Sequence, residues 1–227
     1  MKMKLSEQIR ADREKLKKLP DRNSRLRFIW DYYKYPLLFV STVLVILLVS
    51  FISNIGKADI NLYVVLLNND SPIIECDESV FNNTMSRAGI DMNRKRVDVN
   101  KDLSLGMGTT EATDMETLQV LTALFSISDL DVYVAPKQYF DYFVQENGFA
   151  DLNRLIDRDI LDRYPDDLYG RTDANGNLYV DGIILHQGSP LHKAGYYHDD
   201  VVIGVVNNAY HFDEAIAFLK QLLRDRN

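Results

Sequence analysis

The sequence predicts an α/β protein in which a single transmembrane helix precedes an extracytoplasmic three-layer α/β domain. Three observations lead to this expectation. Residues 36–54 contain no charged side chain, strand-like and helix-like segments alternate after residue 57, and the sign of the charge changes between the two parts. Residues 1–34 carry eleven Lys or Arg and five acids, whereas residues 58–227 carry 14 Lys or Arg and 28 acids, a formal charge of −14.

The uncharged segment is long enough to cross a bilayer. Residues 35–55 would form about 30 Å of helix, which is the thickness of the hydrocarbon core. The basic flank predicts a cytoplasmic amino end and an exported domain at residues 58–227. A cleaved secretory signal is the competing interpretation, but the basic region is about thirty residues long and the apolar run exceeds the usual roughly 7–15 residues. We therefore expect an uncleaved single-pass anchor in the cell membrane.

The first 34 residues form a basic segment with helical periodicity. Leu5, Ile9, Leu16 and Leu19 recur near helical spacing among charged residues, and Pro20 follows them. This pattern predicts an amphipathic helix, which would either lie on anionic lipid or dock to a partner. Trp30, Tyr32, Tyr33 and Tyr35 are the aromatic residues expected at the inner interface of the membrane.

The composition of the exported part argues against nonspecific nucleic-acid binding and against a domain stabilised by its own disulfides. Its strongly acidic charge repels polyanions, so we expect no nonspecific nucleic-acid binding. Cys76 is the chain's one cysteine, so an intramolecular disulfide is excluded and the domain must depend on its hydrophobic core. Cys76 also lies well beyond the apolar run, in a context unlike that of a lipoprotein acylation site.

The first half of the domain predicts strand, helix, strand, helix, strand. Residues 60–67 read as a buried strand that ends in a turn cluster, residues 78–88 as a helix, and residues 96–100 as a second strand. The capping box Thr113-x-x-Glu116 predicts the start of a helix that ends near residue 128. Its predicted buried face is Met115, Leu118, Leu121, Leu124 and Phe125. A third strand at residues 130–135 completes an order that implies parallel pairing.

The second half is less regular. Residues 137–147 predict a helix stopped by Gly148, and Asn175-Gly176 predicts a two-residue hairpin turn. Residues 201–206 and 212–223 then predict a closing strand and an amphipathic helix, whose apolar face is Ile216, Leu219, Leu222 and Leu223.

Several of these segments resemble one known family. The strand Ser128–Val134, the turn Gly148–Leu152, the strand Tyr179–Ile183 and the closing segments at Asn207–Tyr210 and Glu214–Leu219 resemble, in this order, bacterial extracellular solute-binding proteins of the type 2 periplasmic-binding fold. The resemblance implies one lobe, or a shrunken two-lobe form, because the family has about twice this extracellular length. Its members are commonly lipoproteins or soluble. Capture of a ligand between two closing lobes would then be reduced or lost.

Ligands of open α/β sheets bind beyond the carboxyl ends of parallel strands. This rule selects candidate ligand-binding residues after the first strand, before the capped helix and after the third strand. They are Asn68, Asn69, Thr109, Thr110, Lys137 and Tyr139. Gly106–Thr110 could also present backbone N–H groups to an anion, although an ordinary loop is the better interpretation.

No pattern in the chain favours catalysis or metal binding. His186, His192, His198 and His211 have no zinc-motif spacing, and the calcium-like run 173–177 fits a hairpin better. Neither Gly-x-Ser-x-Gly nor a cysteine-protease signature occurs, and adjacent acids are usually solvated. We therefore expect a noncatalytic protein without cofactor or metal that binds a small solute or assists a transporter. The alternative is a protein-docking module of an envelope assembly with no small ligand.

Overall fold

The computed structural model describes residues 30, 34–35, 38–50, 58–70, 76–106, 108–172, 176 and 178–226. The chain divides into two compact units, residues 1–57 and 58–227. In the first unit, residues 38–50 are helical and their large apolar side chains are exposed. No helix among the described residues is both long enough and apolar enough to cross a membrane. The predicted amphipathic helix and the rest of the predicted anchor, apart from Tyr35, lie outside these residues.

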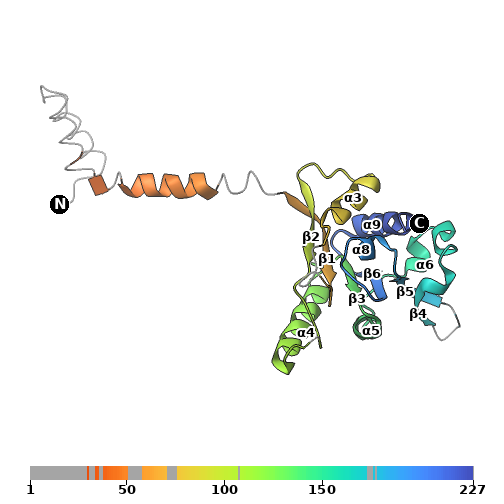
Figure 1. The fold of residues 1–227 in the computed structure, drawn as a ribbon. Coiled ribbons are helices and arrows are strands. Elements are labelled where there is room, and N and C mark those ends of the chain that lie inside the picture. The colour runs from red at the N-terminus through yellow and green to blue at the C-terminus, as the bar shows by residue number, and fades with distance from the viewer. Residues whose placement is uncertain are drawn as a thin grey trace, which may run out of the picture. The chain divides into compact units, whose positions relative to one another are not determined.

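The second unit is built on one mixed sheet of six strands in the order β2-β1-β3-β6-β5-β4 (Figure 1). The strands are β1 (Asp59–Leu66), β2 (Lys95–Asn100), β3 (Val132–Ala135), β4 (Leu168–Thr172), β5 (Leu178–Leu185) and β6 (Val201–Val205). Strand β1 pairs in parallel with both β2 and β3. The parallel pairing predicted for the first half is therefore confirmed.

The other half of the sheet is antiparallel. Strand β6 runs antiparallel to β3, β5 antiparallel to β6, and β4 antiparallel to β5. The last strand in the chain thus lies at the centre of the sheet, between β3 and β5. An α/β architecture is confirmed, and the sheet that forms it is mixed.

Helices cover both faces of this sheet. They are α3 (Ser79–Arg87), α4 (Glu111–Ser126), α5 (Lys137–Gln145), α6 (Leu152–Leu155), α7 (Arg158–Leu161), α8 (Pro190–Lys193) and α9 (Phe212–Arg224), with a 3-10 turn η1 (Pro165–Asp167). The predicted helices at residues 78–88, 137–147 and 212–223 correspond to α3, α5 and α9, so these three predictions are confirmed.

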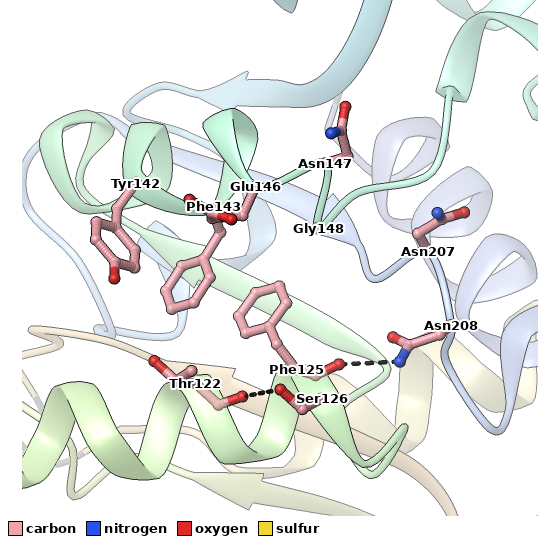
Figure 2. A pocket seen from close by; sticks show the side chains of 10 residues that line it. All are labelled: Thr122, Phe125, Ser126, Tyr142, Phe143, Glu146, Asn147, Gly148, Asn207 and Asn208. Atoms are coloured by element: carbon pink, nitrogen blue, oxygen red, sulfur yellow. Dashed lines mark hydrogen bonds between the residues drawn. The ribbon is translucent and has the colours of Figure 1, made fainter.

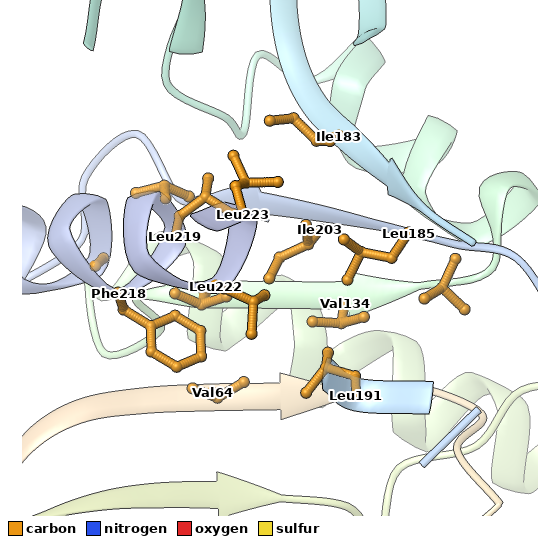
Figure 3. Packing of buried hydrophobic residues seen from close by; sticks show 14 of the residues in the cluster. Val64, Val134, Ile183, Leu185, Leu191, Ile203, Phe218, Leu219, Leu222 and Leu223 are labelled. Carbon is orange, nitrogen blue, oxygen red and sulfur yellow. The ribbon is translucent and has the colours of Figure 1, made fainter. Parts of the chain in front are cut away.

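Side chains of the central strands point alternately to the two faces of the sheet, and a hydrophobic core forms on each face. On one face Val64 of β1, Val134 of β3 and Ile203 of β6 pack under α9, whose Leu219 and Leu222 are fully buried (Figure 3). The side chains between them on the same strands belong to the opposite core, which includes residues of α4 and α5. Because β1, β3 and β6 are buried on both faces, they read in the sequence as nearly continuous apolar runs.

Two glycines let α5 approach the sheet on this second face. An added Cβ at Gly182 of β5 would lie 2.8 Å from Phe140 Cζ, and one at Gly204 of β6 would lie 2.7 Å from the same atom. Phe140 also stacks on Phe149, with ring centroids 4.0 Å apart. The absence of side chains on these neighbouring strands therefore makes a trough, defined by Gly182 and Gly204, in which the ring of Phe140 lies.

The start of α4 differs from the prediction. Its N-cap is Thr110, whose side chain accepts a hydrogen bond from the Thr113 N–H, so Thr113 lies in the first turn rather than at the cap. Leu121 is buried on the predicted face, but Met115 is 63% exposed. The helix begins at Glu111, three residues earlier than a cap at Thr113 would place it, because Thr110 provides the same kind of cap earlier in the chain.

Two further boundaries were predicted wrongly. Thr172 pairs with Leu178, so five residues rather than two connect β4 to β5. Of this connection only Gly176, at φ +84°, is described. The residue that ends α5 in the left-handed region is Asn147, at φ +57°, and the Gly148 N–H donates to the Phe143 carbonyl. Asn is the side-chain-bearing residue that most readily takes this conformation, so it can replace glycine there.

Because of the trough, a single added methyl group should destabilise the domain strongly. We expect Gly204→Ala to lower the free energy of unfolding by about 1–3 kcal/mol, because the added methyl group would lie 2.8 Å from the Asp181 carbonyl oxygen and would press on the stacked rings of Phe140 and Phe149. Urea unfolding of the full-length chain in detergent would measure it. The double variant Gly204→Ala/Phe140→Leu should cost less than the sum of the two single changes. If the free-energy costs of the two single changes add up to that of the double variant, the Phe140 ring does not limit the space at Gly204, and the trough is contradicted.

Candidate functional site

A groove with a volume of about 570 Å³ lies on the domain between α4 and α5 (Figure 2). Ten residues line it, and we call this set the α4–α5 groove. They are Thr122, Phe125, Ser126, Tyr142, Phe143, Glu146, Asn147, Gly148, Asn207 and Asn208. The volume lies in the range of about 300–1,000 Å³ that small-molecule sites occupy.

Aromatic rings form the floor of the groove. Phe125 of α4 and Phe143 of α5 stack with ring centroids 3.9 Å apart, and Phe125 meets Tyr133 of β3 edge-on at 5.4 Å. Tyr142 lies edge-on to Phe143 at 5.0 Å and is about half exposed. The two helices are therefore joined at the floor by stacked rings, and the exposed Tyr142 remains at the rim.

Gly148 lies tightly against this stack. An added Cβ at Gly148 would lie 3.0 Å from Phe125 Cε1 and 3.0 Å from the Phe143 carbonyl oxygen. A side chain at the glycine that the sequence suggests as a helix stop would thus press on the Phe125 ring, which would have to shift by a few tenths of an ångström.

Amide side chains form one end of the groove. Asn208 follows β6, and its Nδ2 donates to the Phe125 carbonyl at 2.9 Å, which fixes the end of α4 to the β6–α9 connection. Asn207 lies beside it and is exposed (Figure 2). On the opposite side the Arg171 guanidinium donates to Asn147 Oδ1. The groove thus offers amides, the hydroxyls of Thr122 and Ser126, and one carboxylate, Glu146, but its described lining contains no Lys or Arg.

A buried ion pair lies behind Asn147. Asp181, which is fully buried on β5, lies 3.4 Å from Arg171 Nη2, yet neither of its carboxylate oxygens has a hydrogen-bond partner among the described residues. Burial raises the pKa of Asp181 to about 6, although the Arg171 charge opposes the shift. The guanidinium also lies over the Tyr179 ring at 4.6 Å. Arg171 therefore links the buried Asp181 to the wall of the groove.

Three of the sequence-predicted ligand residues hold the chain's own backbone instead. Asn68 Nδ2 donates to the Leu105 carbonyl at 2.8 Å, and the Leu105 N–H donates back to Asn68 Oδ1 at 2.7 Å. The Tyr139 hydroxyl donates to the same carbonyl at 2.9 Å. Asn69 Nδ2 donates to the carbonyls of Leu66 and Lys101. These side chains lie at the carboxyl ends of β1 and β3, as predicted, and there they fix the loop that follows β2.

The other predicted residues are dispersed. Thr110 caps α4, and Thr109 donates to the carboxylate of Asp114, which also accepts from the Gly106 N–H at 3.1 Å. These two hydrogen bonds lower the pKa of Asp114. The Gly106 N–H, which could have donated to an anion, thus already donates to the Asp114 carboxylate. Lys137 lies over the Tyr169 ring, 5.0 Å from its centre.

Each of the four histidines has a partner within the domain. His186 lies between Asp167 and Asp200 at 2.8 and 2.7 Å. Although burial opposes its charge, hydrogen bonds to these two acids raise the pKa of His186. His198 contacts Asp70, and His192 contacts the buried Ser189 at the cap of α8. His211 contacts Asp131. Among the described residues no group of three or more His, Cys, Asp or Glu is placed to hold a metal.

Comparison with protein-family models, with curated proteins and with solved structures finds no match to this chain.

Sequence reasoning missed the α4–α5 groove. The resemblance includes Asn207 and Asn208, but it predicts no ligand contact for them. One signal was present, because Asn147-Gly148 and Asn207-Asn208 each follow a predicted element and offer amide groups at its end. The missing information was that β6 lies beside β3, which brings the end of β6 to the end of α4.

The raised pKa of Asp181 predicts a specific pH dependence. Between pH 3.8 and about 6 the native carboxyl holds its proton more strongly than the unfolded one, so the free energy of unfolding falls as pH rises through this window. Asp181→Asn removes this dependence. Its unfolding free energy relative to the wild type should rise by up to about 3 kcal/mol from pH 4 to pH 7.

Urea unfolding at several pH values would measure this difference. The matched control is Asp159→Asn, because the Asp159 side chain is 69% exposed. The control should show no comparable rise relative to the wild type. If Asp181→Asn and the wild type keep a constant difference across the window, Asp181 ionises normally and the interpretation is wrong.

Proposed function

We propose that the chain is a single-pass membrane protein, anchored by residues 35–55, with a cytoplasmic amino end and an extracytoplasmic α/β domain. The charge asymmetry of the flanks supports this orientation. The helix at residues 38–50 supports the anchor, since its large apolar side chains are all exposed to water in the isolated chain. A lipid environment would remove this cost.

The proposed anchor should hold the protein in the membrane, and two lysines in the middle of its helix should abolish this retention. The wild type should stay in the membrane fraction at alkaline pH, whereas Leu44→Lys/Leu47→Lys should be released, because each lysine adds about 2.5–3.5 kcal/mol to insertion at a helix centre. Leu44→Ala/Leu47→Ala is the matched control and should remain in the membrane. External protease should remove residues 58–227 and spare an amino-terminal tag. Release of the wild type would exclude the anchor, and a protected carboxyl-terminal domain would reverse its orientation.

We further propose that the domain is a noncatalytic binding module for a small uncharged polar solute, in the manner of a solute-binding protein or a transporter accessory. The observation that carries this proposal is the lining of the α4–α5 groove. Stacked rings, amides and hydroxyls provide apolar surface and neutral hydrogen-bonding groups, which suit sugars or peptide amides, and the described lining has no cation to attract an anion. The resemblance of the sequence segments to the type 2 periplasmic-binding family points in the same direction.

The proposed mode of binding differs from closure between two lobes. Residues 58–226, as described, form one sheet with its covering helices, so the solute would bind in an open groove on a single lobe. A ligand that stays partly in water makes weaker polar contacts, because the surrounding water screens the electrostatic attraction in each of them. We therefore expect a weaker affinity than two closing lobes would give.

Thermal unfolding of the full-length protein in detergent would test the solute site. The panel would contain glucose, maltose, trehalose, N-acetylglucosamine and neutral dipeptides. A ligand at about 100 times its Kd should stabilise the native state by about 2.7 kcal/mol, a rise in Tm of roughly 5–10 °C. The rise should be lost in Tyr142→Ala and Asn207→Ala, whose side chains are exposed at the groove. It should persist in Tyr210→Ala, an exposed aromatic outside the groove.

The second candidate function is a protein-docking module with no small ligand. Helix α4 favours it, because only Thr117 and Leu121 of its sixteen residues are buried, while Met115, Val120 and the following Ile127 are exposed. The thermal panel separates the two candidates. A well-folded protein whose Tm does not change with any compound would overturn the solute site and leave the docking module.

A further inference from the structure

A second cavity of about 370 Å³ lies on the other side of α4, and its lining differs in character from the α4–α5 groove. Ile60 of β1 and Leu124 of α4 provide apolar walls, and the aromatic residues are Tyr63 and Tyr210. Tyr210 is 79% exposed, so its ring stands at the mouth. We call this the His211 pocket, after the residue that supplies its oriented nitrogen.

A buried carboxylate fixes the orientation of His211. Asp131 is fully buried and accepts hydrogen bonds from the backbone N–H groups of Tyr63 and His211, both at 2.8 Å. Its Oδ2 also lies 2.9 Å from His211 Nδ1. A carboxylate only accepts, so the single ring proton of a neutral imidazole lies on Nδ1, and Nε2 then presents a lone pair. No described residue makes a hydrogen bond to Nε2, and the ring lines the pocket.

The charged groups of the pocket are all acceptors. Asp98 of β2 and Asp129 before β3 line it, and no Lys or Arg is among its described lining residues. Arg96 lies 3.6 Å from Asp98, but both side chains are exposed, so this pair is weak. Tyrosine rings add the negative faces that attract cations. Lone pair, carboxylates and rings together exclude an anion and favour a positive group.

We propose that the His211 pocket binds a primary ammonium or guanidinium group on an alkyl stem. The cationic head lies between Asp98 and Asp129 and donates a hydrogen bond to His211 Nε2, while the stem packs on Ile60 and Leu124. The source of this chemistry is either a free amine or a Lys or Arg side chain of a partner protein. A quaternary ammonium lacks the N–H donor, so it binds more weakly than a primary one.

Isothermal titration calorimetry on the full-length protein in detergent tests the proposal. The probes are n-butylammonium, n-butylguanidinium, tetramethylammonium, butanol and butyrate. A second arm uses the peptide acetyl-Gly-Lys-Gly-amide and the same peptide with its lysine acetylated, which keeps the shape and removes the charge. We expect binding of butylammonium, butylguanidinium or the lysine peptide. Tighter binding of the peptide than of butylammonium identifies a protein side chain as the source, and the reverse identifies a free amine.

Variants place the binding in this pocket. Asp98→Asn/Asp129→Asn should weaken butylammonium at least tenfold, whereas Asp159→Asn, an exposed acid in α7, should leave its Kd unchanged. Tyr210→Ala should weaken it about threefold and Tyr210→Phe should not, because the ring face and not the hydroxyl contacts the cation. Unchanged Tm values would show that these variants fold, since all three residues lie at the surface of the domain.

Three results would overturn the proposal. One is equal binding of butanol, butyrate or the acetylated peptide, which would show that charge is not recognised. Another is a Kd for the cations that does not change in Asp98→Asn/Asp129→Asn. The third is no heat of binding for any cation in a folded protein. None of these results depends on the α4–α5 groove, so this proposal and the solute site fail independently.

Discussion

The buried carboxylate of Asp131 joins three separate parts of the domain. It accepts the Tyr63 N–H from β1 and both the N–H and the ring nitrogen of His211, which is the N-cap of α9, while Asp131 itself precedes β3. A carboxylate removed from water is costly unless donors surround it, and here three do. The entry of β3 into the sheet, the start of α9 and the middle of β1 are thereby held at one point. The cores on the two faces of the sheet form around strands aligned in this way.

The sequence predicted the central elements because burial on both faces leaves a strong pattern. Residues 60–67, 130–135 and 201–206 are nearly continuous apolar runs, and the structure places all three at the centre of one sheet. The amphipathic pattern of residues 212–223 predicted α9 equally well, since that helix has one face on the core and one in water. Such patterns depend on neighbours in the chain, so local reasoning can find them.

The sequence could not predict how β6 enters the sheet. Its position between β3 and β5, antiparallel to both, depends on contacts between residues about 70 and 20 positions apart, for which no local pattern exists. The same long-range pairing brings Asn208 to Phe125 and His211 to Asp131, and hence creates both cavities. The prediction of ligand residues at strand ends followed the rule for parallel sheets, but Asn68 and Tyr139 bind the Leu105 carbonyl there. A rule about position cannot show whether a side chain is already engaged.

The trough under Phe140 also restricts which substitutions this domain can accept in evolution. Gly182 and Gly204 lie on adjacent strands, and the same ring atom lies too close to both for either to carry a side chain. Phe149 stacks on that ring and would meet a side chain at Gly204 as well. Backbone carbonyl oxygens lie equally close, since an added Cβ would lie 2.8 Å from Ile203 O at Gly182 and 2.8 Å from Asp181 O at Gly204. Replacing a ring by a smaller side chain would therefore not make room, and we expect both glycines to be kept in any relative that keeps this strand pairing. The two rings can vary in size more freely than the two glycines beneath them.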